Sequence, residues 1–103
     1  MENKYKFNIY PKAQLDIEGI VNYIANVLLN PIAATDFIND LKSAFETVCI
    51  FPECCPLINN DMVRDKTLRK LLVKNYIAFY RIRSNEIQVV RVLYGMSNYQ
   101  SIL

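Results

Sequence analysis

The hydrophobic residues of this chain change their spacing twice, and that change constrains the fold more than any single motif does. Residues 5–9 alternate between apolar and polar side chains, which is typical of a half-buried β-strand, and Pro11 ends the pattern. Apolar residues then recur at helical spacing, at Ile17, Ile20, Val21, Ile24 and Leu28. The spacing predicts a helix from Pro11 to about Leu29.

A second helix is predicted immediately after the first. Asn30 is a strong N-cap residue and Pro31 suits the first helical position, so the pair predicts both a stop and a restart. The expected core-facing stripe consists of Ala34, Phe37, Ile38, Leu41, Phe45 and Val48. Pro52 ends this helix. Two amphipathic helices joined by so few residues are predicted to form an antiparallel hairpin with a shared core.

The spacing returns to that of strands after a predicted loop at residues 52–66. Three runs rich in β-branched and aromatic residues follow, at residues 68–73, 76–82 and 87–94. Because Asn tolerates positive φ, two-residue hairpin turns are predicted at Lys74-Asn75 and Ser84-Asn85. The sequence therefore predicts a single α+β domain over residues 1–103. The domain is expected to begin with a strand, followed by an antiparallel helical hairpin that packs on an antiparallel sheet. This sheet contains a three-stranded C-terminal meander, which ends at Gly95.

The turns also predict which side chains share a face of the sheet, since cross-strand partners point the same way. One face collects Leu68, Lys70, Leu72, Ile77, Phe79, Arg81, Val90 and Val92. This face is the more aliphatic at its middle and is expected to lie under the helices. The other collects Arg69, Leu71, Val73, Tyr76, Ala78, Tyr80, Val89, Arg91 and Leu93. Arginines among tyrosines are typical of a recognition surface, so this second face is expected to bind a partner.

Several chemistries are excluded by composition. The chain has no histidine, which removes the commonest general base. Its cysteines, at positions 49, 54 and 55, cannot assemble a four-ligand zinc site, and its glycines, at 19 and 95, cannot form a phosphate-binding loop. We therefore expect no metal and no cofactor, and interpret Cys54-Cys55 as loop packing. Unpaired cysteines, with no signal peptide or membrane span, favour the cytoplasm.

Basic residues are concentrated in the second half of the chain. Residues 53–103 hold 8 Lys or Arg against 4 Asp or Glu, whereas the whole chain carries a net charge of only +2. This asymmetry is weak evidence for an anionic partner, because a solvated basic surface is the commoner explanation.

The order of predicted elements and several short segments together resemble a known family over nearly the whole chain. The segments are Pro11-Lys12-Ala13, Asn22-Tyr23-Ile24, Asn30-Pro31, Ala33-Ala34, Phe51-Pro52, residues 76–82, residues 91–95 and residues 99–103. They are similar to the RelE/ParE superfamily of toxins from bacterial type II toxin–antitoxin modules, which are known as plasmid-stabilisation systems. The resemblance implies a cognate antitoxin protein as the partner, inhibition of growth when the toxin is free, and no association with a membrane.

Members of this superfamily divide in mechanism. RelE-like members resemble ribosome-dependent endoribonucleases that cut mRNA, whereas the ParE-like branch is associated with poisoning DNA gyrase and is not known for a catalytic site. The ribonuclease branch typically has an arginine after the tyrosine that opens the second meander strand, and another after the glycine that ends the last strand. This chain has Ile77 and Ser97 there. The resemblance therefore favours a ParE-like toxin that is not an enzyme, with the metal-independent ribonuclease as the alternative.

The expected antitoxin- or target-binding residues are Arg69, Tyr76, Tyr80, Arg91 and Tyr94. If the chain is a ribonuclease, the resemblance points instead to Lys70, Arg91 and Tyr99. Basic candidates are predicted to split between the two sheet faces, so we do not expect them to converge on one phosphate. A third hypothesis is an attenuated toxin that only binds its antitoxin, because Met96-Ser97 replaces two arginines found in many relatives.

Overall fold

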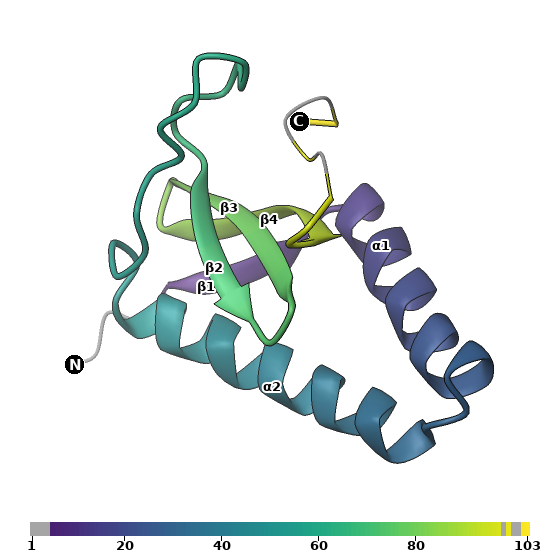
Figure 1. Ribbon diagram of the computed structural model, residues 1–103. Helices are drawn as coiled ribbons and strands as arrows, with labels where there is room; N and C mark the ends of the chain where they lie inside the picture. The colour runs from purple at the N-terminus through teal and green to yellow at the C-terminus, as the bar shows by residue number, and fades with distance from the viewer. Residues whose placement is uncertain (1–4, 98, 100–101) are drawn as a thin grey trace.

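Two helices pack on one face of a four-stranded sheet (Figure 1). The computed structural model describes residues 5–97, 99 and 102–103. Its elements follow the order β1 (Lys6–Ile9), α1 (Pro11–Asn22), the short π-helical segment η1 (Tyr23–Val27), α2 (Pro31–Ile50), β2 (Arg69–Val73), β3 (Tyr76–Arg83) and β4 (Glu86–Tyr94). The predicted α+β class, with its strand, two helices and three-stranded meander, is confirmed.

The strands are arranged in the order β1-β4-β3-β2. The meander is antiparallel throughout, as predicted, but β1 pairs with β4 in parallel, with Lys6 opposite Glu86. Parallel neighbours need a long connection, and the helices together with β2 and β3 supply it. The sheet is therefore mixed rather than purely antiparallel.

Both predicted hairpin turns are present. Ser84 and Asn85 have φ values of 52° and 63°, the pattern of a tight primed turn, whereas at the first turn the positive φ of 55° falls on Lys74. Gly95 follows the last strand, and its amide donates a hydrogen bond to the Asn75 carbonyl at 2.8 Å. A Cβ atom at this position would lie 3.1 Å from the same oxygen, so the close approach favours glycine.

The stop and restart between the helices is also confirmed. The helical backbone of α1 continues through η1 to Val27, and Leu29 then adopts a φ of 52°. The side-chain oxygen of Asn30 accepts a hydrogen bond from the Ala33 amide at 3.1 Å, which caps α2. Figure 1 shows α1 and α2 diverging from this connection, and both contribute to the core against the sheet.

Five of the six residues in the predicted α2 stripe are buried: Ala34, Phe37, Leu41, Phe45 and Val48. Ile38 is the exception, with 45% of its surface exposed, and Cys49 is buried instead. Ile38 lines a groove that residues of α1, α2 and β1 share. Its exposure leaves an apolar surface between the helices, described below.

The face that the helices cover is the opposite of the predicted one. The core beneath them contains Val73, Ala78, Tyr80, Ile87, Val89 and Val92. The predicted helix-covered face, with Leu68, Ile77 and Phe79, instead packs against Ile58 and Val63 of the loop before β2, and against Tyr99 and Leu103. Both faces of the sheet are thus covered, and both are hydrophobic for that reason.

A β-bulge in β4 changes the pairing that the second turn predicts. Tyr80 lies opposite Val89, as expected, but Phe79 lies opposite Arg91, so Val90 has no direct partner. The extra residue reverses the alternation for the rest of β4. Arg91 therefore moves to the face covered by the loop, and Val92 joins the core under the helices.

Candidate functional site

Arg91 is held by a carboxylate from α1. Its Nε atom lies 2.7 Å from Oδ2 of Asp16 and its Nη2 atom lies 2.9 Å from Oδ1, so the guanidinium is engaged in a bidentate pair. The Val92 amide donates a third hydrogen bond to Oδ2 of Asp16 at 3.0 Å. Bonding to Asp16 raises the pKa of Arg91 above its usual value. Arg91 thus fastens α1 to β4, and only 21% of its side chain is exposed.

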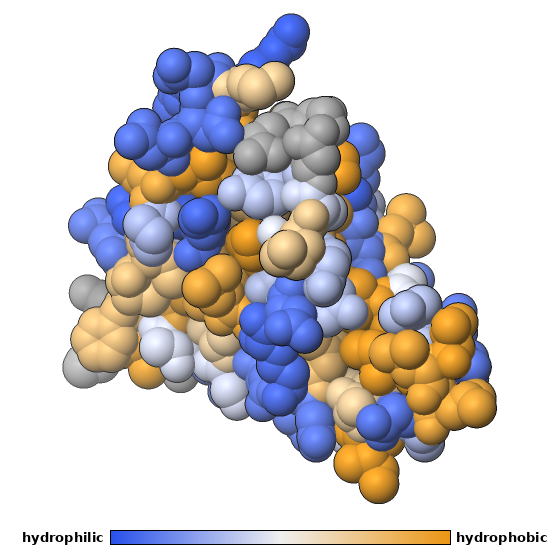
Figure 2. All heavy atoms as spheres, in the orientation of Figure 1, coloured by the Kyte–Doolittle hydropathy of each residue, from blue (hydrophilic) through white to orange (hydrophobic). Residues whose placement is uncertain are grey.

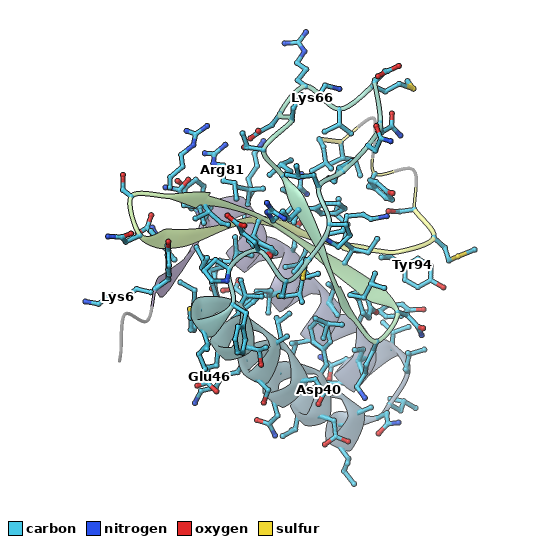
Figure 3. The ribbon with its side chains drawn as sticks, turned by 90° about the vertical axis from the view of Figure 1, so that its left-hand side faces the viewer. Lys6, Asp40, Glu46, Lys66, Arg81 and Tyr94 are labelled. Carbon is cyan, nitrogen blue, oxygen red and sulfur yellow. The ribbon has the colours of Figure 1, made fainter. Side chains whose placement is uncertain are left out.

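Arg81 is held in the same way by the loop before β2. Its Nη1 atom lies 2.8 Å from Oδ2 of Asp65, and its Nε atom donates to Gln88 at 2.8 Å. Burial opposes ionisation of Asp65, but hydrogen bonds from Thr67 and Arg81 outweigh it, and the pKa of Asp65 is lowered. Figure 3 shows Arg81 on the far side of the sheet from Asp40 of α2. A second arginine is therefore neutralised by a carboxylate.

The residues expected of a ribonuclease lie closer together than predicted. Lys70 and Arg91 are the cross-strand neighbours of Phe79 on its two sides, and the Tyr99 ring lies 5.1 Å from the Phe79 ring. The prediction that the basic candidates split between the faces is therefore wrong for Lys70 and Arg91. The β-bulge, which the sequence does not signal, is the reason.

Tyr80 is not accessible to a partner. Its side chain is completely buried, and its hydroxyl donates a hydrogen bond to the Pro52 carbonyl at 2.8 Å. Burial raises the pKa of Tyr80 well above its usual range. The assignment of Tyr80 to a binding surface is therefore wrong, because the face that carries it lies under the helices. It connects the sheet to the loop after α2.

The other predicted binding residues have different surroundings. Arg69 donates a hydrogen bond from Nη1 to the Cys55 carbonyl at 2.6 Å, which attaches β2 to the same loop. Tyr76 is half-buried, with its ring 5.1 Å from that of Phe37 and 5.8 Å from that of Tyr94. Tyr94 is exposed to 49%. The role of these residues in binding stays a prediction.

Tyr76 and Tyr94 line a groove of about 800 Å³ beside α1, together with Tyr23 and Leu28. Next to it, Figure 2 shows apolar side chains gathered over the connection between the helices. The exposed apolar residues there are Val27, Leu28, Leu29 and Ile32, with exposed fractions between 55% and 79%. A monomer seldom exposes so many large apolar side chains together, so this end of the molecule is a candidate contact surface.

A second groove, which the sequence did not reveal, lies between α1, α2 and β1. It has a volume of about 620 Å³, and its walls are largely apolar: Phe7, Ile9, Ile17, Val21, Ala25, Ile38, Leu41 and Phe45. Polar side chains form its rim, at Gln14, Glu18, Asn22, Asn26 and Lys42. The helical spacing placed Ile17, Val21 and Ile38 in a closed core.

The described part of the chain contains neither a metal-binding cluster nor a membrane-spanning helix. Within residues 5–97, 99 and 102–103, no cluster of three or more His, Cys, Asp or Glu side chains is placed to hold a metal ion. No helix in those residues is both long enough and apolar enough to cross a membrane.

Comparison with known proteins identifies the family. The family model for the ParE toxin of the type II toxin–antitoxin system parDE matches residues 8–99. The chain belongs to the ParE toxin family. No curated protein sequence matches it significantly.

Solved structures of related toxins share the fold. One similar structure is a chromosomal ParDE TA system from P. aeruginosa, with a TM-score of 0.72 and 18% identity, covering 90% of this chain and 98% of that one. Another is the toxin–antitoxin complex RelBE2 from Mycobacterium tuberculosis, with a TM-score of 0.61 and 15% identity, covering 88% and 98% respectively. At these identities the likeness concerns the fold alone.

Proposed function

We propose that this ParE-family chain is a toxin that acts by binding a cellular protein target, such as DNA gyrase, and not by cutting RNA. The observation that carries the proposal is the pairing of Arg81 with Asp65 and of Arg91 with Asp16. A metal-free nuclease must place free cations around a phosphate to stabilise its transition state. Here the two arginines nearest such a site already hold carboxylates.

Three further residues support this reading of the loop-covered face. Ile77 and Ser97 occupy positions where ribonuclease relatives typically carry arginine. Ile77 is buried between the sheet and the loop before β2. Lys70 is thus the basic residue of this cluster without a carboxylate partner among the ion pairs described. One lysine beside a tyrosine does not provide the several positive groups that the ribonuclease mechanism needs.

We further propose that a cognate antitoxin neutralises the toxin by occupying the groove between α1, α2 and β1. The solved relatives include toxin–antitoxin complexes. A groove with apolar walls and polar rims suits the apolar face of an amphipathic helix, whose own polar face stays in water. The expected occupant is a helical segment of the antitoxin with apolar residues at helical spacing.

The mode of action is tested with the purified chain in two assays. We expect inhibition of DNA supercoiling by gyrase and no new ends in ribosome-bound mRNA. Specific mRNA cuts that are abolished by Lys70→Ala would overturn the proposal in favour of the ribonuclease. Lys70 is the right variant because it forms no described ion pair, so its loss does not loosen the fold. Normal growth on expression, together with antitoxin capture, would instead identify an attenuated toxin.

The groove is tested by two matched substitutions on α2. Ile38→Asp places a charge in the groove, whereas Ile50→Asp changes an isoleucine of similar exposure, 55% against 45%, that lies outside it. In pull-downs with the small protein encoded beside this gene, we expect Ile38→Asp to weaken capture at least about tenfold, the effect of removing a well-buried apolar contact. Equal capture by both variants would contradict the assignment.

A further inference from the structure

Two neighbouring thiols in the loop after α2 have no part in the proposed toxin function. Cys54 is exposed and Cys55 is half-buried, and their Sγ atoms lie 3.5 Å apart. Cys49, the third cysteine, is buried in the core under the helices. Cys54 and Cys55 are therefore the cysteines of the described chain that a reagent in solution can reach.

The fold fixes the loop on both sides of this pair. Before it, the Pro52 carbonyl accepts the hydrogen bond from the buried Tyr80 hydroxyl at 2.8 Å. After it, the Cys55 carbonyl accepts a hydrogen bond from Arg69 at 2.6 Å, and the Pro56 carbonyl accepts one from the Lys70 amide at 3.1 Å. The loop backbone that carries the two thiols is thus held by contacts with β2 and β3.

This spacing is unsuited to two common fates of paired cysteines. A disulfide needs sulfurs about 2.0 Å apart and Cα atoms at least about 4.4 Å apart, whereas neighbours across a trans peptide are about 3.8 Å apart. The peptide bonds described here are not cis. A structural zinc ion needs four ligands, and the described residues offer no third donor beside the pair.

A single atom bonded to both sulfurs fits the 3.5 Å distance between them well. An atom bonded to both sulfurs at about 2.3 Å, the usual length for a thiolate bond to a soft centre, would subtend an angle of about 100° at their observed separation. That angle suits a pyramidal three-coordinate centre whose third bond is to its own substituent. We propose that Cys54 and Cys55 form a dithiol site that captures trivalent organoarsenicals as a cyclic dithiolate.

The capture step is a condensation without electron transfer. An organoarsenic oxide loses its oxygen, two As–S bonds form, and two S–H bonds break, so that both protons leave with the oxygen as one water molecule. Cys54 reacts first because it is exposed, and Cys55 closes the ring. The hollow beside Cys54, lined by Ile50, Phe51 and Ile82, is apolar and receives an aryl substituent on the arsenic.

The test uses the full chain and phenylarsine oxide. We expect one arsenic per chain, and after unfolding only one of the three thiols should remain reactive. In excess monothiol, Cys54→Ser and Cys55→Ser should each bind about 100-fold more weakly, because the second bond no longer forms within one molecule. Cys49→Ala is the matched control and should capture as the unmodified chain does. A small dithiol should remove the arsenic.

Three results would overturn the proposal. One is protection of a single thiol per arsenic, and another is undiminished capture by Cys54→Ser, which changes an exposed residue and so tests the site even if Cys55→Ser fails to fold. The third is equal affinity of the folded and the urea-unfolded chain. If the fold pre-arranges the sulfurs, the folded chain should bind at least about tenfold more tightly.

Discussion

The pair between Asp16 and Arg91 should be worth far more than an ordinary surface ion pair, and Asp16→Ala tests this. Asp16 accepts three hydrogen bonds, two from the guanidinium and one from the Val92 amide, and the two side chains are only 14% and 21% exposed. Removing one partner of a fully buried pair costs about 3–5 kcal/mol. Because water reaches part of this pair, we expect a loss of about 2–4 kcal/mol.

The matched control is Asp40→Ala. Asp40 lies 2.8 Å from Lys74, but these side chains are 47% and 54% exposed. Exposed pairs contribute at most about 1 kcal/mol, and salt weakens them further. Asp16→Asn should fall between the two variants, since the amide keeps one oxygen acceptor but loses the charge.

Urea unfolding followed by circular dichroism measures these differences. We expect Asp16→Ala to shift the midpoint without changing the slope, and to lower Tm by roughly 10–20 °C. In a double-mutant cycle with Arg91→Ala, the double variant should lose about 1–3 kcal/mol less than the sum of the single variants. Equal losses for Asp16→Ala and Asp40→Ala, or additive losses in the cycle, would refute the view that this pair fastens α1 to the sheet.

Three smaller effects follow from other contacts. Tyr80→Phe should lose about 1 kcal/mol in urea unfolding, because the hydroxyl bond to the Pro52 carbonyl disappears while the ring still fills the core. Because the pKa of Asp65 is lowered in the folded state, its ionised form stabilises the fold above about pH 4, and this stabilisation is lost as the pH falls through the folded-state pKa. Asp65→Asn should therefore lose less stability than the unmodified chain on acidification. An unchanged dependence of stability on acid pH would contradict this. Asn30→Ala should cost about 1 kcal/mol by thermal unfolding, since the cap of α2 is lost, whereas Asn30→Gly should cost only a few tenths.

Local patterns predicted the elements of this fold because each one has its own short-range signal. Asn30 and Pro31 separate the helices, and Ser84-Asn85 adopts the positive φ values that its turn needs. The parallel pairing of β1 has no such signal, since it depends on where the helices return the chain. The covered face was also beyond local reasoning, because a loop covers the second face and makes both faces apolar.

The candidate site was less predictable for a related reason. Arg91 was expected on the recognition face, but one extra residue at the bulge turned it to the other side, where it meets Asp16 from the far end of the sequence. No glycine or proline marks that bulge in Val89-Val90-Arg91. Tyr80 and Ile38 show opposite errors, one expected at the surface and found buried, the other expected in the core and found exposed.

The parallel pairing of β1 with β4 has a consequence for synthesis of the toxin. Lys6 emerges from the ribosome well before its partner Glu86, which lies 80 residues later in the chain. Pairing between such distant segments comes late in folding. Until residues 86–94 have left the ribosome, β1 has no β4 to pair with and Asp16 of α1 has no Arg91 to bind. The β1 side of the groove between the helices is therefore not held in place. If an antitoxin binds this groove as proposed, we expect it to bind chains in which residues 86–94 have already paired with β1.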